Sequence, residues 1–238
     1  MSLLVVTGTG TEVGKTVVSA AVCAAALHPG SPVPTPRVAY LKTAQTGVAA
    51  ARPVTGERPD DADIDTVRRL VPGVVVAEGP RYPDPLSPAA AARVAGLPPV
   101  DLSAVSALAR DLAARHDLVV LEGAGGLLVP YDDRGGTLAD LARDLDAPVL
   151  VVTAAGLGTL NVTALTLEAL AARSLTCAGV VIGSWPKRPG LAERCNLADL
   201  AGGSLAGVVP EGAGTLEPQT FRRLAADVLG SWLQTWWS

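Results

Sequence analysis

A glycine-rich segment near the N-terminus, Gly8–Thr16, has residue types and spacing suited to binding phosphate groups. It follows the apolar run Leu3–Thr7 and ends in Gly-Lys-Thr, where an apolar helical stretch begins. In such loops, backbone amides at a helix N-terminus surround phosphates, a lysine reaches the terminal phosphates and a threonine hydroxyl ligates magnesium. A plain glycine turn would not need Lys15 and Thr16 in the first helical turn. The spacing is a variant, because Thr9 occupies the position where the first glycine is expected.

A second candidate segment is Glu122–Gly126, in which a carboxylate followed by small residues ends the apolar run Leu118–Leu121. Ligands bind at the carboxyl ends of strands in open α/β sheets, and Mg²⁺ prefers one or two carboxylates together with phosphate oxygens. We therefore expect Glu122 to ligate magnesium and not to cap a helix. The acidic run Asp60–Asp65 stays open, since acidic clusters are more often solvated faces or helix caps than metal ligands.

The elements that must position these residues follow from the apolar pattern. The expected strands are Leu3–Thr7, Arg37–Leu41, Leu118–Leu121, Val149–Thr153 and Ala178–Ile182. The expected helices are Lys15–Leu27, Ile64–Leu70, Leu102–Arg115, Thr159–Arg173 and one from Pro218 onward. Continuous apolar strands that alternate with helices predict a doubly wound α/β fold, with a mostly parallel sheet flanked by helices. No repeat or break in composition indicates a second domain, so residues 1–238 are expected to form one.

Smaller features refine this picture. Expected helix caps are Asp63, Asp101 and Thr215. Three irregular stretches are Pro29–Pro36, Thr43–Ala62 and Gly79–Pro88. The first is expected to be a surface insertion, and the other two lie where they could cover a site. The C-terminal Trp232, Trp236 and Trp237 are expected to pack the last helix or a subunit contact.

Composition and charge exclude several classes of protein. The 238 residues are 49% hydrophobic and 18% charged, which suits a large buried core. A net charge of −4 with dispersed lysines and arginines gives no basic patch for nucleic acid. The longest apolar run, Val17–Leu27, is too short to cross a membrane, and the start of the chain does not resemble a signal peptide, so a soluble cytoplasmic protein is expected. Cys23, Cys177 and Cys195 lack disulfide or zinc spacing and are expected to fill the core.

Five motifs occur along the chain in a characteristic order. They are Thr7–Thr16, Tyr40–Lys42 with Gln45–Gly47, the acidic run Asp60–Asp65, Glu122–Gly126 and Leu157–Asn161. In this order the chain resembles the dethiobiotin synthetase family, which has the P-loop NTPase fold, from end to end. The resemblance implies a homodimeric ligase of biotin biosynthesis with Mg²⁺ as cofactor. It would close the ureido ring of dethiobiotin from 7,8-diaminopelargonate, CO₂ and ATP, with release of ADP and phosphate.

The resemblance also implies roles for individual residues. The residues of the phosphate loop that would bind ATP are Glu12, Val13, Gly14, Lys15, Thr16 and Val17. The magnesium ligands would be Thr16, Asp63 and Glu122, with Asp63 preferred to Asp61 because it directly precedes the helix. Further nucleotide contacts would come from Asp63, Glu122, Gly123, Ala124 and Gly125. Substrate contacts would come from Lys42, Thr46, Gly125, Thr159, Leu160 and Asn161, the last three from the helix N-terminus of the other subunit.

The implied chemistry needs positive charge but no protein nucleophile. A carbamate formed from one substrate amine and CO₂ attacks the γ-phosphate, and the second amine closes the ring on the resulting carbamic-phosphoric anhydride. Positioning and electrostatics dominate phosphoryl transfer, so the catalytic residues implied are Lys15, Lys42 and Thr11, aided by magnesium. His28 and His116 lie at expected helix ends and are expected to be solvated caps.

Two positions depart from the family pattern. Thr43 follows Lys42, where the family often has proline. Gly183–Pro186 stands where many members place an asparagine whose amide contacts adenine. Because glycine has no such amide, several nucleoside triphosphates are expected to be accepted. The residues expected to contact ribose and base are Gly183, Ser184, Pro210, Glu211 and Gly212.

Two other classes of protein share this fold. A partitioning or regulatory ATPase would carry a signature lysine five residues before Lys15, where this chain has Gly10. It would also tend to show a basic patch or an amphipathic membrane tail. A cobyrinate-type amidotransferase would need a glutaminase domain, for which the chain has no room. The synthetase is therefore the favoured interpretation.

Overall fold

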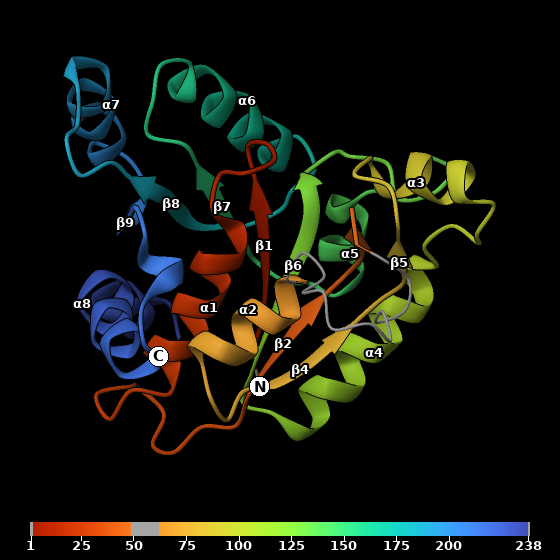
Figure 1. The fold of residues 1–238 in the computed structure, drawn as a ribbon, viewed down its shortest axis with the longest axis horizontal. Coiled ribbons are helices and arrows are strands. Elements are labelled where there is room, and N and C mark those ends of the chain that lie inside the picture. Colours follow the sequence, from red (N-terminus) through yellow and green to blue (C-terminus); the bar gives the residue numbers. More distant parts are fainter. Residues whose placement is uncertain (1, 49–61, 238) are drawn as a thin grey trace, which may run out of the picture.

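The computed structural model describes residues 2–48 and 62–237, and its centre is a seven-stranded sheet in which every neighbouring pair is parallel (Figure 1). In their order across the sheet, the strands are β4 (Val75–Glu78), β2 (Val38–Lys42), β6 (Leu118–Gly126), β1 (Ser2–Gly8), β7 (Val149–Thr153), β8 (Cys177–Trp185) and β9 (Leu205–Pro210). A separate two-stranded parallel sheet joins β3 (Gln45–Thr46) to β5 (Arg81–Tyr82). The predicted doubly wound α/β fold is confirmed.

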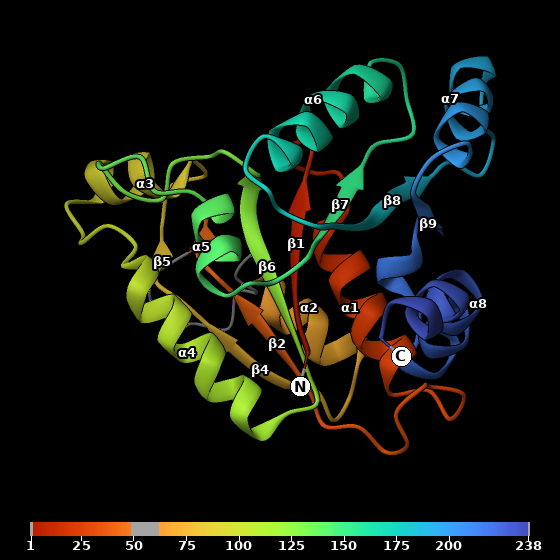
Figure 2. The ribbon, with the colours of Figure 1, turned by 180° about the vertical axis from the view of Figure 1, so that it is seen from behind.

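Helices cover both faces of the sheet because successive strand residues point to opposite sides. One face packs α1 (Lys15–Ala26), α2 (Asp63–Leu70) and α8 (Pro218–Trp236). The other packs α3 (Pro88–Ala95), α4 (Leu102–Arg115) and α5 (Leu138–Asp144), as Figure 2 shows from behind. Two further helices, α6 (Thr159–Ala171) and α7 (Leu191–Ala201), lie toward the end of the molecule to which β1 and β6 point (Figures 1 and 2).

All five expected strands and all five expected helices are present. The bounds of β7 and α4 agree with the prediction, and the others differ by a few residues at their ends, most of all β6, which continues past Leu121 to Gly126. Two edge strands, β4 and β9, and three helices, α3, α5 and α7, were not predicted. The residues of Gly79–Pro88 include β5, and those of Thr43–Ala62 include β3, while residues 49–61 lie outside the described part of the chain.

Two of the three expected helix caps are wrong. Asp101 accepts hydrogen bonds from the amides of Ser103 and Ala104 and caps α4 as expected. Asp63, in contrast, is itself the first residue of α2, and the N-cap residue, Ala62, makes no side-chain hydrogen bond to the helix. Thr215 ends a short 3₁₀ helix, while α8 begins after Glu217.

The remaining expectations about packing have mixed outcomes. The side chain of Cys23 is buried and that of Cys177 half-buried, but Cys195 is exposed on α7, so the expectation of core cysteines is wrong there. Trp232 and Trp236 stack with ring centroids 5.4 Å apart, and the Trp232 indole donates a hydrogen bond to the Ala178 carbonyl. These tryptophans therefore pack the last helix against the sheet. Among the described residues, no helix has the length and apolar character needed to cross a membrane.

Candidate active site

The loop between β1 and α1 has the conformation of a phosphate-binding loop. Gly14 caps the N-terminus of α1 with a φ of 92°, and an ideal Cβ there would lie 2.6 Å from the carbonyl oxygen of Gly183. Only glycine satisfies both the left-handed backbone and the lack of space. The Lys15 ammonium turns back over this loop and donates a hydrogen bond of 2.8 Å to the Gly10 carbonyl. A lysine held along the loop in this way suits contact with the terminal phosphates of a nucleotide.

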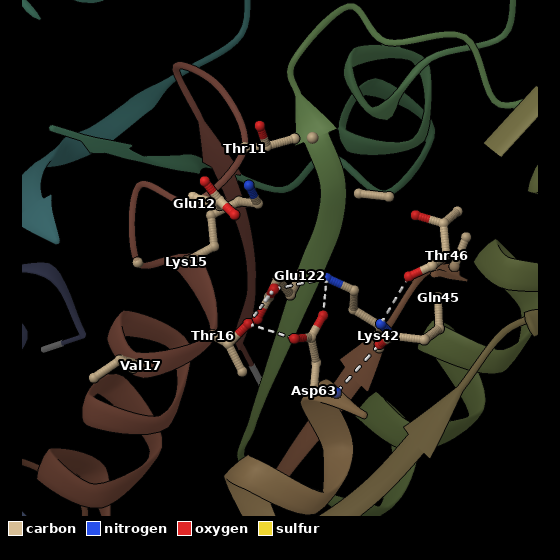
Figure 3. Close-up of a pocket in the computed structure, with 14 residues that line it drawn as sticks. Thr11, Glu12, Lys15, Thr16, Val17, Lys42, Gln45, Thr46, Asp63 and Glu122 are labelled. Carbon is tan, nitrogen blue, oxygen red and sulfur yellow. Dashed lines mark hydrogen bonds and ion pairs between the residues drawn. The ribbon is translucent and has the colours of Figure 1, made fainter. Parts of the chain in front are cut away.

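Thr16, Asp63 and Glu122 converge from three elements on one point (Figure 3). The Thr16 Oγ1 lies 2.9 Å from Asp63 Oδ1 and 3.0 Å from Glu122 Oε1. A hydroxyl has one hydrogen and can donate to only one of these oxygens. Two carboxylates around a hydroxyl oxygen are a donor set that Mg²⁺ accepts when phosphate oxygens and water complete its shell. The three residues predicted as magnesium ligands are thus brought together, and their chemistry fits that metal.

Lys42 lies between the same two carboxylates. Its Nζ is 2.6 Å from Asp63 Oδ2 and 2.7 Å from Glu122 Oε1, and it also donates to the Gly123 carbonyl at 3.2 Å. Burial, the strongest single influence, disfavours the charged ammonium, but the two carboxylates outweigh it and raise the pKa of Lys42. The side chain is therefore a fixed positive charge among the residues that line the site. Its position follows from the register of the sheet, in which Lys42 and Glu122 are neighbours on adjacent strands.

Electrostatic coupling extends to the other charged groups of the site. Burial favours the protonated form of Asp63, but the Lys42 charge and the hydrogen bonds from Lys42 and Thr16 prevail and lower its pKa below the ordinary value. Burial also lowers the pKa of Lys15, and the nearby charge of Lys42 adds to this effect. Two lysines that line one cavity indicate a site built for a ligand of high negative charge.

Two residues that touch this group were not predicted as site residues. The Tyr40 hydroxyl donates a 2.9 Å hydrogen bond to Glu122 Oε2, and the Gln45 side-chain oxygen accepts from the Asp63 amide at 3.3 Å. Tyr40 precedes Lys42 by two residues on a buried strand, so strand alternation places both side chains on one face and could have identified it. Gln45 follows the end of that strand, and no periodic pattern indicated its contact.

A cavity of about 410 Å³ opens over these residues. Its lining includes most of the predicted nucleotide, metal and substrate residues. They are Thr11, Glu12, Gly14, Lys15, Thr16, Val17, Lys42, Thr46, Asp63, Glu122, Ala124 and Gly125, together with Ala44 and Gln45. Val13 and Gly123 are buried behind this lining. The phosphate loop and the predicted substrate residues of β2 and β3 therefore share one space.

The residues predicted to contact ribose and base lie beside this cavity and do not line it. They form one group, because the Glu211 amide donates a 2.8 Å hydrogen bond to the Trp185 carbonyl and joins the ends of β8 and β9. Gly183 is buried against the phosphate loop, and an ideal Cβ there would lie 2.0 Å from the Val13 carbonyl oxygen. Ser184 and Pro210 are exposed next to it. A side chain able to contact a base could thus extend from position 184 but not from position 183.

The N-terminus of α6, predicted to contact substrate, lies apart from the cavity lining. Thr159 is buried and donates a hydrogen bond to the Ala154 carbonyl at 2.7 Å, whereas Leu160 and Asn161 are exposed. The Thr159 hydroxyl is also 2.6 Å from that of Thr153, which in turn lies 3.2 Å from the hydroxyl of Thr9 in the phosphate loop. The contact of α6 with a substrate in the same cavity stays a prediction.

Comparisons with known proteins cover nearly the whole chain. Residues 2–219 match the family described as an AAA domain. The chain is 57% identical to the ATP-dependent dethiobiotin synthetase BioD of Saccharopolyspora erythraea over the full length of both. It is 56% identical to that of Streptomyces avermitilis, over 98% of this chain and 95% of that one.

Solved structures at low sequence identity share the fold alone. The cell division ATPase MinD of Pyrococcus furiosus has a TM-score of 0.55 at 18% identity, over 95% of this chain and 98% of that chain. A ParA family ATPase of Chlorobium tepidum has a TM-score of 0.53 at 13% identity, over 99% and 96%. The P-loop architecture is common to all of these proteins, whereas identity above half along the entire length is found with the synthetases. The chain therefore belongs to the dethiobiotin synthetase family.

Proposed function

We propose that this protein is an ATP-dependent ligase that closes the ureido ring of dethiobiotin from 7,8-diaminopelargonate and CO₂ in biotin biosynthesis. The observation that carries the proposal is the convergence of two lysines, two carboxylates and a threonine hydroxyl on one cavity beside the phosphate loop. Relatives with more than half of their residues identical carry the name of this activity. ADP and phosphate leave as products.

Thr16, Asp63 and Glu122 would hold the magnesium ion of the bound nucleotide. Bound there, the metal would offset negative charge on the phosphate oxygens. Lys15 contacts the terminal phosphates from the side of the loop, while Glu12–Val17 present backbone amides to them. These groups stabilise the charge that develops during phosphoryl transfer, and none of them forms a covalent bond with the phosphoryl group.

Lys42 and Thr46 would contact the diamino acid from the opposite wall of the cavity. The carbamate that forms on one amine is an anion, and Lys42 would supply positive charge to it once Asp63 and Glu122, which hold its ammonium in this structure, ligate the metal. Attack by the carbamate oxygen on phosphorus expels ADP, and the second amine then attacks the anhydride carbon and expels phosphate. No step requires a protein nucleophile. Thr11 and the backbone of Gly125 line the same space and would position the reacting groups.

The proposal extends to assembly and location. The chain forms a single domain that works as a homodimer in the cytoplasm, with Thr159–Asn161 of one subunit completing the substrate site of the other. A helix N-terminus favours a carboxylate, which the diamino acid carries. Support comes from the exposure of Leu160 and Asn161 at the start of α6.

The test is a complete reaction with purified protein. Incubation with 7,8-diaminopelargonate, bicarbonate, Mg²⁺ and ATP should produce dethiobiotin by mass spectrometry, with one ADP for each molecule of product. Parallel reactions without the diamino acid or without bicarbonate serve as controls. ATP hydrolysis that proceeds equally in the absence of the diamino acid, with no dethiobiotin, would show the protein to be a nucleotide switch instead.

A further inference from the structure

Behind the wall of the cavity, two buried hydroxyl side chains connect β2 to the segment that carries Glu122. The carbonyl oxygen of Glu122 accepts hydrogen bonds from both the amide and the hydroxyl of Thr43, each 3.0 Å long. The Thr43 hydroxyl lies 2.8 Å from that of Tyr131, and the Tyr131 oxygen accepts from the Ala124 amide at 2.8 Å. Thr43 and Tyr131 are completely buried.

The direction of every hydrogen bond in this group can be worked out. A carbonyl oxygen carries no hydrogen, so the Thr43 hydroxyl must donate its only hydrogen to Glu122. Thr43 then accepts from Tyr131, whose oxygen accepts from the Ala124 amide. The bonds run in one direction from the backbone of Ala124 to the backbone of Glu122, and every hydrogen is used. Chains of this kind are cooperative and hold their members in a single geometry.

The segment between these two anchors is the end of β6, where the pairing with β1 is irregular between Val6 and Gly8. Gly123 has no side chain, and an ideal Cβ there would lie 2.3 Å from a methyl carbon of Leu138. Gly125 adopts a φ of 74°, which glycine tolerates without cost and other residues rarely adopt. Glu122, Ala124 and Gly125 nevertheless line the cavity. The geometry of a cavity wall rich in glycine therefore depends on contacts made from behind.

We propose that Thr43 and Tyr131 are positioning residues, which hold the backbone of Glu122–Gly125 so that the Glu122 carboxylate meets the metal of the bound nucleotide. The assignment of that ligand rests on the proposed function. Lys42 holds the carboxylate of Glu122 from within the cavity, while its neighbour Thr43 holds the carbonyl of the same residue from outside it. A proline at position 43 would supply neither of the two donors. Contacts of this kind behind a metal ligand are worth about 10- to 100-fold in metal affinity or activity.

Three substitutions separate positioning from ordinary support of the fold. Tyr131→Phe keeps the ring but removes the oxygen that the Ala124 amide needs, and Thr43→Val removes the hydroxyl but keeps the amide. Thr43→Ser keeps both the hydroxyl and the amide and should therefore keep function. The matched control is Tyr82→Phe, since the Tyr82 hydroxyl donates a 2.8 Å hydrogen bond to the Pro98 carbonyl in a buried position outside the cavity lining.

The experiment measures binding of Mn²⁺ together with a non-hydrolysable ATP analogue by electron paramagnetic resonance, and thermal unfolding of each variant without ligand. Tyr131→Phe and Thr43→Val should weaken metal binding about 10- to 100-fold, while Thr43→Ser and Tyr82→Phe stay within about threefold of wild type. The metal dependence of kcat should shift in parallel.

Each outcome has a distinct meaning. Wild-type metal affinity in Tyr131→Phe and Thr43→Val would overturn the positioning role, whatever their loss of thermal stability. Weakened metal binding in these variants, with a wild type that binds metal and nucleotide but makes no dethiobiotin, would support the positioning role and overturn the proposed function. A wild type that binds no metal with nucleotide would overturn both.

Discussion

Helices α1 and α6 begin in the same way but differ in how much of each helix is buried. Each follows a strand through a glycine in the left-handed region, Gly14 with a φ of 92° and Gly158 with a φ of 93°. Yet ten of the 12 residues of α1 are buried, against three of the 13 residues of α6. A side chain at Gly14 would collide with Gly183, whereas the space beside Gly158 is open. The same local signal therefore produces a helix enclosed by its own chain and a helix that its own chain leaves uncovered.

The two helices therefore differ in whether one chain alone can form the site at the helix N-terminus. The first turn of α1 supplies Lys15 and Thr16 to a site whose three proposed metal ligands all come from this chain. The first turn of α6 is exposed, and the apolar side chains Leu157 and Leu165, 92% and 56% exposed, lie before it and along it. Large exposed apolar residues gathered on one element indicate a contact surface. The phosphate chemistry should therefore depend on residues of one chain, and binding of the diamino acid also on a second copy.

The largest effect is expected at the enclosed helix. Lys15→Ala should lower the rate of ring closure by about 10³-fold or more, because a charge acting on the transferring phosphoryl group is lost. Among the described residues, the Lys15 side chain makes its only hydrogen bond to the Gly10 carbonyl, so the thermal stability of Lys15→Ala should be close to that of wild type. Lys42→Ala, by contrast, should lose both activity and stability, because it leaves Asp63 and Glu122 without their shared cation. Steady-state kinetics and thermal unfolding of both variants check this, and rapid turnover by Lys15→Ala would contradict it.

A smaller effect is expected at the metal site. Asp63→Asn should raise the Mg²⁺ concentration for half-maximal activity at least tenfold, because an amide is a poorer ligand than a carboxylate. Asp65→Asn, two residues along the same helix, should stay within about 0.5 kcal/mol of wild type in stability and near it in activity. The same is expected of Asp61→Asn, although Asp61 lies outside the described residues. A stronger effect at Asp65 than at Asp63 would move the ligand to the neighbour.

The exposed helix should show an effect on assembly and on one substrate only. Leu165→Glu should weaken the dimer by introducing a charge into an apolar contact, and raise KM for 7,8-diaminopelargonate about tenfold, while KM for ATP changes little. Val94→Glu is the control, because Val94 is 66% exposed on α3. Light scattering after size exclusion gives the mass of each variant. A Leu165→Glu protein that remains a dimer with normal kinetics would show that α6 makes no such contact.

The sequence predicted what local patterns encode. The phosphate loop was predictable because Gly-Lys-Thr follows a buried strand directly, and Glu122 because it ends a continuous apolar run. Strand β4 escaped prediction because it is a four-residue edge strand, with Val75 exposed. Helix α3 consists mostly of alanine and shows little contrast between apolar and polar positions, whereas α2, of the same length, places Ile64, Val67 and Leu70 on one face.

Contacts between segments that lie far apart in the sequence could not be predicted from such local patterns. The pairing of Lys42 with Glu122 depends on two strands that lie far apart in the sequence becoming neighbours in register. The series of hydrogen bonds from Tyr131 through Thr43 to Glu122 forms only when three segments meet, and no spacing in the sequence indicates it. The proximity of Gly183 to the phosphate loop likewise appears only in three dimensions. The residue types that form the site and the strands that carry them could be predicted from the sequence, but the residues that they contact could not.

The smallest effect is expected for the choice of nucleotide base. The sequence predicts that the protein accepts several nucleoside triphosphates, since position 183 has no amide to pair with adenine. A site without a base-reading group leaves nothing unpaired when the base is wrong, so discrimination is weak. Values of kcat/KM for ATP, CTP, GTP and UTP should therefore span less than about a hundredfold, or about 3 kcal/mol.

The structure decides which substitution can test this. A side chain at Gly183 would press on the Val13 carbonyl and disturb the phosphate loop, so Gly183→Asn would lower activity with every nucleotide. Ser184 is exposed beside it and can carry a longer amide without this collision. Ser184→Asn should raise the preference for ATP by up to about tenfold, the value of one hydrogen bond, and leave ring closure with saturating ATP unchanged. A wild type that already prefers ATP by a hundredfold or more would mean that another residue contacts adenine.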